Sequence, residues 1–535
     1  MVVAVRKNVL FLAADDFRIQ LGVDRVPGTH KMSTPNLDAL VSKSLFLRKA
    51  QVQQAVCSPT RTSLLTSRYP DTTRVWDLYS YFRDVGGNYT TIPELFKLNG
   101  YKTIGAGKIF HPGHASGGQH PDAKNQKGDD TPYSWTEPYY HSPDGSHWDS
   151  SQHSYLAVPP QDEKQIPLPD TQIADSAIQT LESLALQGVG TNLEAEEGQP
   201  FFLAVGFHKP HLPFVAPVKF FDLYPFDEIE LPQDQDAPKD MPRVAWSDWG
   251  ELRNYQDIAA LNNSGVPGDK LPVNVTKALR RAYYAAVSYM DDQLGRVVAA
   301  LDQHGFSNNT VISFWGDHGW QLGEHGEWCK HTNFDLATNA PMMVHIPGQT
   351  DHGITTSTPT EFIDLMPTLA AAAMPGVTVP ACPEDAEAAR KVQLCTHGVS
   401  LLPLIDAPDS PVKPAAYSQY PRGYQRPEQV GQPMHDIVSD NGPSACLSKH
   451  CTMGYSMLTS VEGVEYRYTE WVDFNTVHAN APDWDRVVGT ELYNHNADPL
   501  ENVNIAPEAD KALLAQLSAL LRKHPVAGVA ARQEL

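Results

Sequence analysis

The chain has 535 residues, more than one hydrophobic core usually serves, so a large domain with a smaller one is expected. Hydrophobic residues make up 41% of the chain and charged residues 19%, a balance typical of a folded globular protein rather than a disordered one. The formal net charge of −22 argues against nucleic acid as a partner, which would favour a basic surface, and no apolar run reaches the length of a membrane span.

The first predicted elements are a buried strand and two helices. Residues 8–14 are mostly apolar and are followed by two aspartates, without the three regions of a signal peptide. Thr34 followed by Pro35 is typical of a helix N-terminus and predicts a helix through about residue 46. Thr91 starts a second predicted helix, which stops at Gly100.

Strands and helices continue to alternate through the first two-thirds of the chain. Residues 102–107, 201–206 and 311–315 are short and apolar, as expected of buried strands, and residues 276–303 carry apolar side chains at helical spacing. This alternation predicts an α/β domain with a large, mostly parallel sheet flanked by helices. In such folds ligands bind beyond the carboxyl ends of the strands. Residues 113–170 lack periodicity and predict a long irregular excursion.

The last quarter of the chain has a different pattern. Proline-rich residues 403–414 suggest a boundary, so we expect a main domain over 1–405 and a C-terminal subdomain over 406–535. Within that subdomain, residues 463–472 predict a strand and residues 507–523 a terminal amphipathic helix. Together they predict a small α+β unit.

The six cysteines are too few to hold a chain of this length together as a disulfide scaffold. Cys382 with Cys395, and Cys446 with Cys451, are close enough in sequence to pair in an oxidising compartment. Reduced thiols are an equally good interpretation of this spacing.

Four polar clusters follow apolar segments, and the first two combine acidic groups with a cysteine. Asp15 and Asp16 come directly after the first strand; adjacent carboxylates suit Ca²⁺ or Mg²⁺, although by itself an acidic turn is the simpler interpretation. Cys57 precedes a predicted helix start at Ser58 and Pro59, where exposed N–H groups favour an anion. This cysteine could be a thiolate nucleophile of low pKa or a buried structural thiol.

The other two clusters supply cationic and proton-transferring groups. Lys108 and His111 follow one predicted strand, and His208 follows another. Imidazoles near an anionic ester can relay protons, while a lysine supplies a fixed positive charge. For any one histidine, a structural hydrogen bond is the simpler interpretation. The fourth cluster, after the strand at 311–315, contains Asp317, His318, Trp320 and Lys330.

The segment from Cys57 to Arg68, Cys-Ser-Pro-Thr-Arg-Thr-Ser-Leu-Leu-Thr-Ser-Arg, resembles the signature of the type I sulfatases, whose cysteine is oxidised to formylglycine. The family pattern has serine and glycine where this sequence has Thr60 and Ser67. In order, and from about residue 8 to 505, the four clusters resemble the sulfatase branch of the alkaline-phosphatase superfamily. Further stretches resemble the members that act on 2-sulfated uronic acids: 107–113, 130–135, 201–211, 316–335 and 417–422.

The resemblance implies an alkaline-phosphatase-like fold and a sulfuric ester hydrolase acting on a sulfated carbohydrate, with the 2-O-sulfate of a uronic acid as the expected substrate. It implies Ca²⁺, in preference to Mg²⁺, and a formylglycine-generating enzyme as maturation partner. It also implies a secreted, periplasmic or lysosome-like compartment, although this sequence shows no signal peptide. Two alternatives stay open: a phosphate or phosphonate ester hydrolase of the same superfamily, and a non-catalytic binder of sulfated glycans.

The resemblance also implies catalytic roles. Arg61 and Lys108 are expected to hold the formylglycine oxygens and the charges of the metal site. Lys330 and His208 are expected to grip the sulfate, and one of them to protonate the departing alkoxide. His111 is the expected base that collapses the sulfated intermediate.

Metal and sugar contacts are implied in the same way. The implied metal ligands are Asp15, Asp16, the modified Cys57, Asp317 and His318. Because calcium prefers oxygen ligands, His318 could instead form a hydrogen bond with the sulfate. Asp130 and Trp320 are expected to contact the sugar, together with His331, which replaces a tyrosine beside the pocket lysine.

Overall fold

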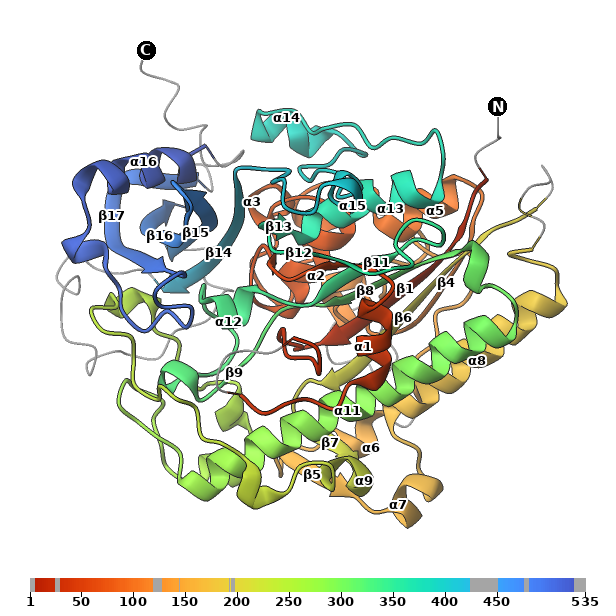
Figure 1. Cartoon of the computed structure of the whole chain (residues 1–535), viewed down its shortest axis with the longest axis horizontal. Coiled ribbons are helices and arrows are strands. Elements are labelled where there is room, and N and C mark those ends of the chain that lie inside the picture. Colours follow the sequence, from red (N-terminus) through yellow and green to blue (C-terminus); the bar gives the residue numbers. More distant parts are fainter. Residues whose placement is uncertain are drawn as a thin grey trace.

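The computed structural model describes residues 5–24, 29–118, 128–143, 145–191, 193, 198–423, 451–475 and 481–523. Its centre is a seven-stranded sheet with the order β12-β2-β11-β8-β1-β6-β4 (Figure 1). In that order the strands are Ile354–Thr356, Leu45–Leu47, Met342–His345, Thr310–Gly316, Asn8–Asp15, Phe201–Pro210 and Lys102–Gly107. Strands β8, β1, β6 and β4 run parallel, whereas β11 is antiparallel to both of its neighbours. The sheet is therefore mixed and mostly parallel, as predicted.

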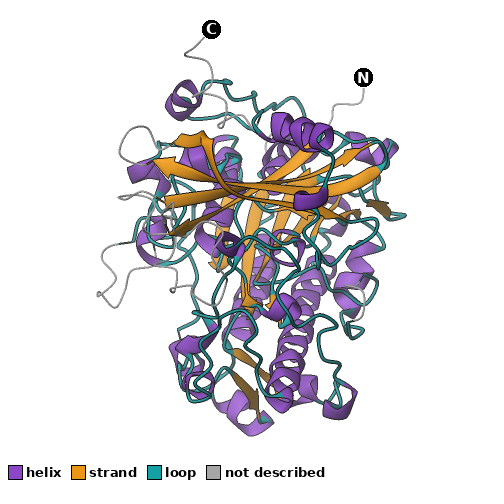
Figure 2. Cartoon of the chain, turned by 90° about the vertical axis from the view of Figure 1, so that its left-hand side faces the viewer, coloured by secondary structure: helices purple, strands orange, loops and turns teal. Residues whose placement is uncertain are grey.

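Helices cover both faces of this sheet (Figures 1 and 2). On one face, Leu10 and Leu12 of β1 share a core with α8 (Pro169–Leu186) and α11 (Val273–Gln303). On the other face, Val9 and Phe11 share a core with α2 (Cys57–Thr66), α5 (Ile92–Leu98) and α13 (Leu365–Ala373). Successive residues of a strand point to opposite faces, so one apolar strand supplies both cores.

The predicted strands and the long helix are confirmed, but the first helix is shorter than predicted. The helix α1 (Pro35–Val41) ends five residues before the expected position 46. The apolar residues Leu45–Leu47 pair with β11 and β12 as part of the sheet. Strand pairing, rather than local helix propensity, therefore determines the structure of these residues. Thr91 caps α5 through a capping box with Glu94, as its position predicted.

Residues 113–170 are mostly irregular, as predicted, and carry only short elements. The remaining elements of the main body are also short. They are β3 (Ala50–Gln51), α3 (Pro70–Thr73), α4 (Phe82–Val85), α6 (Gly145–Trp148), β5 (Tyr155–Val158), α7 (Pro160–Gln165), β7 (Phe214–Pro217), α9 (Val218–Phe221), α10 (Gln256–Ala259), β9 (Gln321–Leu322), β10 (Trp328–Cys329), α12 (Asp335–Thr338), β13 (Thr360–Glu361), α14 (Ala386–Lys391) and α15 (Pro403–Asp406).

A four-stranded antiparallel sheet forms the C-terminal part (blue in Figure 1). Its strands are β14 (Ala415–Gly423), β15 (Cys451–Val461), β16 (Val464–Asn475) and β17 (Ala481–Asn494). Leu517 and Leu521 of α16 (Lys511–Leu521) join the core of this sheet. The predicted strand and terminal helix are thus present, with bounds shifted by a few residues. The division of the chain at residue 405 stays a prediction.

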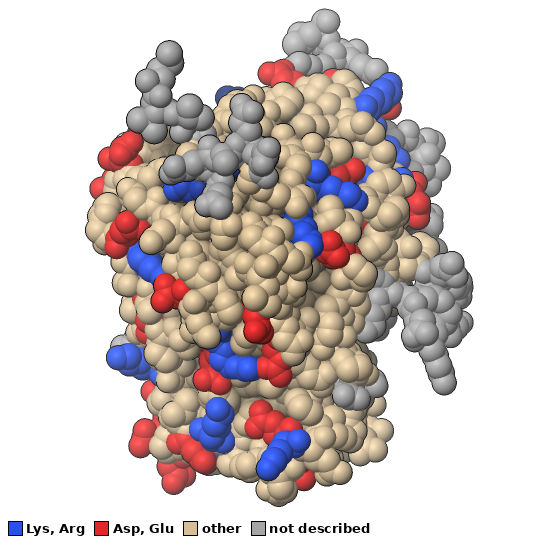
Figure 3. All heavy atoms as spheres, turned by 90° about the vertical axis from the view of Figure 1, so that its right-hand side faces the viewer, with Lys and Arg blue, Asp and Glu red and all other residues tan. Residues whose placement is uncertain are grey.

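The first predicted cysteine pair is a disulfide between Cys382 and Cys395. The second pair includes Cys446, which lies outside the described residues. Within the described part of the chain, no helix combines the length and the apolar character needed to cross a membrane. On the face shown in Figure 3, basic and acidic side chains are interspersed rather than gathered into one field.

Candidate active site

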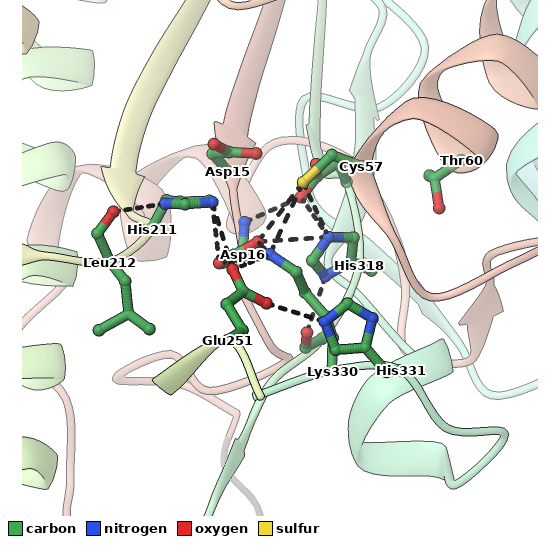
Figure 4. A network of polar contacts seen from close by, with 12 residues as sticks. Asp15, Asp16, Cys57, Thr60, His211, Leu212, Glu251, His318, Lys330 and His331 are labelled. Carbon is green, nitrogen blue, oxygen red and sulfur yellow. Dashed lines mark hydrogen bonds and ion pairs between the residues drawn. The ribbon is translucent and has the colours of Figure 1, made fainter. Parts of the chain in front are cut away.

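The polar clusters predicted from the sequence meet at one edge of the central sheet. Strand β1 ends at Asp15, β4 ends immediately before Lys108, and β8 ends immediately before Asp317. Because these strands are parallel, their carboxyl ends lie side by side. Helix α2 brings Cys57 to the same edge (Figure 4). Cys57 is the first residue of that helix, with Val56 at the N-cap, so the helix begins one residue before the predicted start at Ser58.

Arg61 ties the carboxylates of two strands together. Its guanidinium lies 2.9 Å from Asp15 Oδ1 and 3.0 Å from Asp317 Oδ2, and it also donates to the carbonyl of Ile109. All of these side chains are buried. Burial would raise the pKa of the Asp15 carboxyl, but the adjacent Lys108 and Arg61 hold that pKa well below its usual range. Asp15 is therefore anionic and bound to two cations.

Cys57 is 3% exposed and surrounded by charged groups. Its Sγ lies 3.7 Å from Lys330 Nζ, 3.4 Å from His318 Nε2 and 3.8 Å from Asp16 Oδ1 (Figure 4). It also lies 3.9 Å from Lys108 Nζ. Burial raises the pKa of the Cys57 thiol well above its usual range, although the two lysines oppose the shift. A thiolate of low pKa is therefore the less favoured of the two interpretations that the sequence left open.

Four of the five predicted metal ligands form one buried group. The ligand atoms of Asp16, Cys57, Asp317 and His318 all lie within 4.8 Å of one another. Burial, followed by neighbouring carboxylates and only partly offset by Lys330, raises the pKa of Asp16 well above its usual range; that of Asp317 is raised to about 6. Buried carboxylates crowded in this way fit a hard divalent cation, which would relieve their repulsion. Asp15 is not one of these four; it forms ion pairs with Arg61 and Lys108 and lies within 4.8 Å of Cys57 and His211 in a second group.

Lys330 is held from several sides. Its ammonium lies 2.7 Å from Asp16 Oδ1, 3.0 Å from Glu251 Oε1 and 5.0 Å from the centre of the Trp320 ring. The residues on both sides of it, Cys329 and His331, have left-handed backbone with φ of 75° and 79°. Such strain persists only where the surroundings impose it, and it often marks functional sites.

His211, rather than the predicted His208, lies beside Asp15, Asp16 and Cys57. The Nε2 atom of His211 lies 3.7 Å from Asp16 Oδ2, and His211 groups with Asp15 and Cys57 within 4.8 Å. His208 lies on β6, which ends at Pro210, one residue before His211; it lines the adjacent cavity but is not part of this group. The structure thus brings His211 to the centre. Its signal was present in the sequence, three residues later in the same His-Lys-Pro-His stretch.

His111 stays beside Lys108 at the rim of the site. Burial, and then the charge of Lys108, lowers the pKa of His111 to about 3, so its imidazole is neutral at ordinary pH. A neutral imidazole can accept a proton, and the role of His111 as the base stays a prediction.

A cavity of about 290 Å³ opens onto this cluster. Two of its aromatic residues, Trp148 and Tyr255, were not identified from the sequence, since each lies in a stretch without periodicity. Its lining residues are Asp15, Lys108, Pro112, Trp148, Asp149, Leu168, Pro169, His208, Lys209, His211, Leu212, Pro213, Val215 and Tyr255. Aromatic faces with a few polar groups are typical of sites for small molecules.

The three residues predicted to contact the sugar do not line this cavity. Asp130 is buried and its carboxylate accepts hydrogen bonds from Tyr81, Arg83 and Ser134. Trp320 is 1% exposed and packs beneath Lys330. His331 lies 2.9 Å from Glu251 and 2.7 Å from the hydroxyl of Tyr420. These contacts position neighbouring groups; a direct contact with the sugar stays a prediction for all three.

Comparisons with known proteins agree with this geometry. The sulfatase family model matches residues 7–376. Iduronate 2-sulfatase of Homo sapiens is 38% identical, over 95% of this chain and 93% of that protein. A solved structure of a protein with its substrate D-glucosamine-2-N,6-O-disulfate is similar, with a TM-score of 0.64 and 19% identity over 99% of this chain and 100% of that one. A phosphonate monoester hydrolase of Agrobacterium radiobacter gives a TM-score of 0.64 and 20% identity, over 99% and 98%. The alkaline-phosphatase-like fold is thereby confirmed.

Proposed function

The chain belongs to the sulfatase family, and on this premise we propose that it hydrolyses a sulfate ester of a carbohydrate, namely the 2-O-sulfate of a uronic acid. The observation that carries the proposal is the place of Cys57. This residue of the sulfatase signature lies within 4 Å of Lys108, Lys330 and His318, and Lys108 also lines an adjacent cavity that can admit a small ligand. The name of the human relative supports the choice of sugar.

We infer that Cys57 is converted by a formylglycine-generating enzyme. A buried thiol whose pKa is raised is a poor nucleophile, so the residue as encoded does not suit the chemistry. A formylglycine at this position would hydrate to a geminal diol, which offers one hydroxyl to take up the sulfate and a second to expel it.

The surrounding residues suit a divalent cation and an anionic substrate. Asp16, Asp317, His318 and the modified residue 57 would hold the cation, with Asp15 beside them. Ca²⁺ fits the carboxylate oxygens better than a softer ion; it would withdraw charge from a sulfate oxygen and lower the pKa of a hydroxyl at position 57.

Lys108 and Lys330 reach residue 57 from two sides, at 3.9 and 3.7 Å from Sγ. Two ammonium groups placed in this way can bind the oxygens of a sulfate attached there and stabilise the charge that develops in transfer. Arg61 holds the carboxylates behind them in a fixed arrangement. These three cations orient the reacting groups.

Proton transfer falls to the histidines. The neutral His111 would accept the proton of a hydroxyl at residue 57 as the sulfate leaves. His211 lies near both Asp15 and Cys57. Burial, and then the charge of Lys330, lowers the pKa of its imidazole to about 3, and the negative charge of a bound sulfate would raise that pKa again. It is then placed to protonate the departing alkoxide, and we assign it this role in preference to His208.

The test is a desulfation screen over defined glycosaminoglycan disaccharides, with the Cys57→Ala variant as the control. We expect sulfate release from a terminal 2-sulfated uronic acid by the wild-type protein and none by the variant, with the same melting temperature for both. Failure on every uronic acid 2-sulfate would refute the sugar assignment. Activity that survives in Cys57→Ala would refute the mechanism.

A further inference from the structure

Glu251 places a negative charge among the cations that face Cys57. It lies directly before a short 3₁₀ turn, Leu252–Asn254, in a stretch without any recognisable motif. Its Oε1 atom lies 3.0 Å from Lys330 Nζ and 3.6 Å from His211 Nε2, and its Oε2 atom lies 2.9 Å from His331 Nε2 (Figure 4). Its side chain is 20% exposed, so it lies near the open side of the site.

The carboxylate of Glu251 is ionised. Burial would raise its pKa, but Lys330 and then His331 hold that pKa well below its usual range. Lys330 contacts a second carboxylate as well, because both oxygens of Asp16 lie within 3 Å of its ammonium. An extra carboxylate beside a lysine that must bind an anion weakens the attraction for that anion. Glu251 therefore opposes the binding of negative charge at Lys330, and this effect bears on which substrate the site accepts.

We propose that Glu251 is a specificity-determining residue, whose charge makes the pocket favour a singly charged sulfate ester over a doubly charged phosphate ester. This inference rests on the proposed function of the same site. Both esters present a tetrahedral group of similar shape, so shape discriminates poorly between them. They differ in charge, since a phosphate monoester loses its second proton near pH 6.

The charges of the site support this selection. Three cations, Arg61, Lys108 and Lys330, contact the three buried carboxylates of Asp15, Asp16 and Asp317. Glu251 is a fourth carboxylate, and it makes the net charge of the site more negative by one unit, whatever ion the other three carboxylates bind. It lies on the side of Lys330 that also faces His211, where an incoming anion would bind.

The size of the effect follows from the distances. An anionic group bonded to Lys330 would lie within about 6 Å of the Glu251 carboxylate, because each contact spans about 3 Å. At that distance, in a partly exposed site, one additional negative charge on the ligand is disfavoured by about 10- to 100-fold. Removing the charge of Glu251 should therefore raise kcat/KM for the doubly charged substrate by that factor, relative to the singly charged one.

The experiment compares three esters that share a 4-nitrophenyl leaving group. At pH 8 the sulfate and the phenylphosphonate carry one negative charge, and the phosphate carries two. We expect Glu251→Gln to raise the ratio of kcat/KM for the phosphate to that for the sulfate by about 10- to 100-fold. The ratio for the phenylphosphonate to the sulfate should change less than about threefold, because the charge is equal and only the central atom differs.

Two control variants isolate the charge at this one position. Glu251→Asp keeps the carboxylate and should keep the phosphate-to-sulfate ratio near that of the wild type. Asp248→Asn removes the same charge from the same loop, but its carboxylate bonds Arg253 and the backbone of Gly250 instead of Lys330. It should also leave that ratio nearly unchanged. If Glu251 only supported the loop, Glu251→Gln would lower turnover of all three esters alike, and the proposal would be wrong.

Binding of inorganic sulfate gives a readout that needs no turnover. Sulfate is doubly charged, so calorimetric titration of the metal-loaded protein should show tighter binding to Glu251→Gln than to the wild type, by about tenfold or more. An unchanged affinity would overturn the proposal. A wild-type protein that cleaves no sulfate ester would refute the proposed function, and the sulfate affinities of the two proteins would still decide the role of Glu251.

Discussion

Replacing Lys330 with methionine should weaken turnover and strengthen metal binding in the same protein. The ammonium lies 2.7 and 2.9 Å from the two oxygens of Asp16 and 3.7 Å from Cys57 Sγ. A calcium ion bound to Asp16 at the usual distance of about 2.4 Å would lie within about 5 Å of that ammonium. Their repulsion is about 1.5 kcal/mol even at the dielectric constant of water, and larger in a buried site. We therefore expect calcium to bind Lys330→Met at least about tenfold more tightly.

Turnover should change in the opposite direction. Loss of one charged donor at the developing sulfate is expected to lower kcat by about 10²- to 10³-fold. Calcium affinity is measured by titrating chelated protein and following its melting temperature, and turnover by sulfate release at saturating calcium. Lys330→Arg keeps the charge and should keep the wild-type affinity for calcium. Weaker calcium binding by Lys330→Met, or an undiminished kcat, would refute this account of the lysine.

Two further predictions concern stability. Glu324 lies 3.1 Å from Arg18 and 2.9 Å from Arg280, both buried, so Glu324→Gln leaves two buried guanidinium groups without a counter-charge and should destabilise the fold by about 3–5 kcal/mol. For a chain of this size that corresponds to a melting temperature lower by about 3–5 °C, and an unchanged value would contradict the reasoning. Burial disfavours the charge of His495, but Glu465 and Glu501 raise its pKa to about 9. Its contribution of up to about 3 kcal/mol is present below pH 6.5 and lost as the pH rises through 9, so the melting temperature of His495→Gln should fall less over that range than that of the wild type.

The sequence contained enough information to predict the sheet but not the limits of every helix. Strands such as β1 and β8 are buried throughout because helices cover both of their faces, and a continuous apolar run of this kind can be recognised in the sequence alone. The end of α1 could not be predicted from the sequence, because it depends on the pairing of Leu45–Leu47 with strands that lie some 300 residues away along the chain. Local propensity does not contain that information.

The candidate site shows the same division. Asp15, Asp317 and Lys108 could be located because each follows a strand of a parallel sheet, so their meeting at one edge is a consequence of topology. Glu251 lies in an irregular segment and Trp148 is the last residue of the short helix α6, and nothing in the sequence there indicates which side chains turn towards the site. The preference for His211 over His208 depends on the path of the chain at the end of β6, which residue types do not specify.

The chemical state of residue 57 tests the account most directly. Protein from its native source is digested, and the peptide that contains this position is analysed by mass spectrometry. Conversion to formylglycine predicts a mass about 18 units below that of the encoded cysteine peptide. Sulfate release by a preparation in which every such peptide retains cysteine would contradict the account.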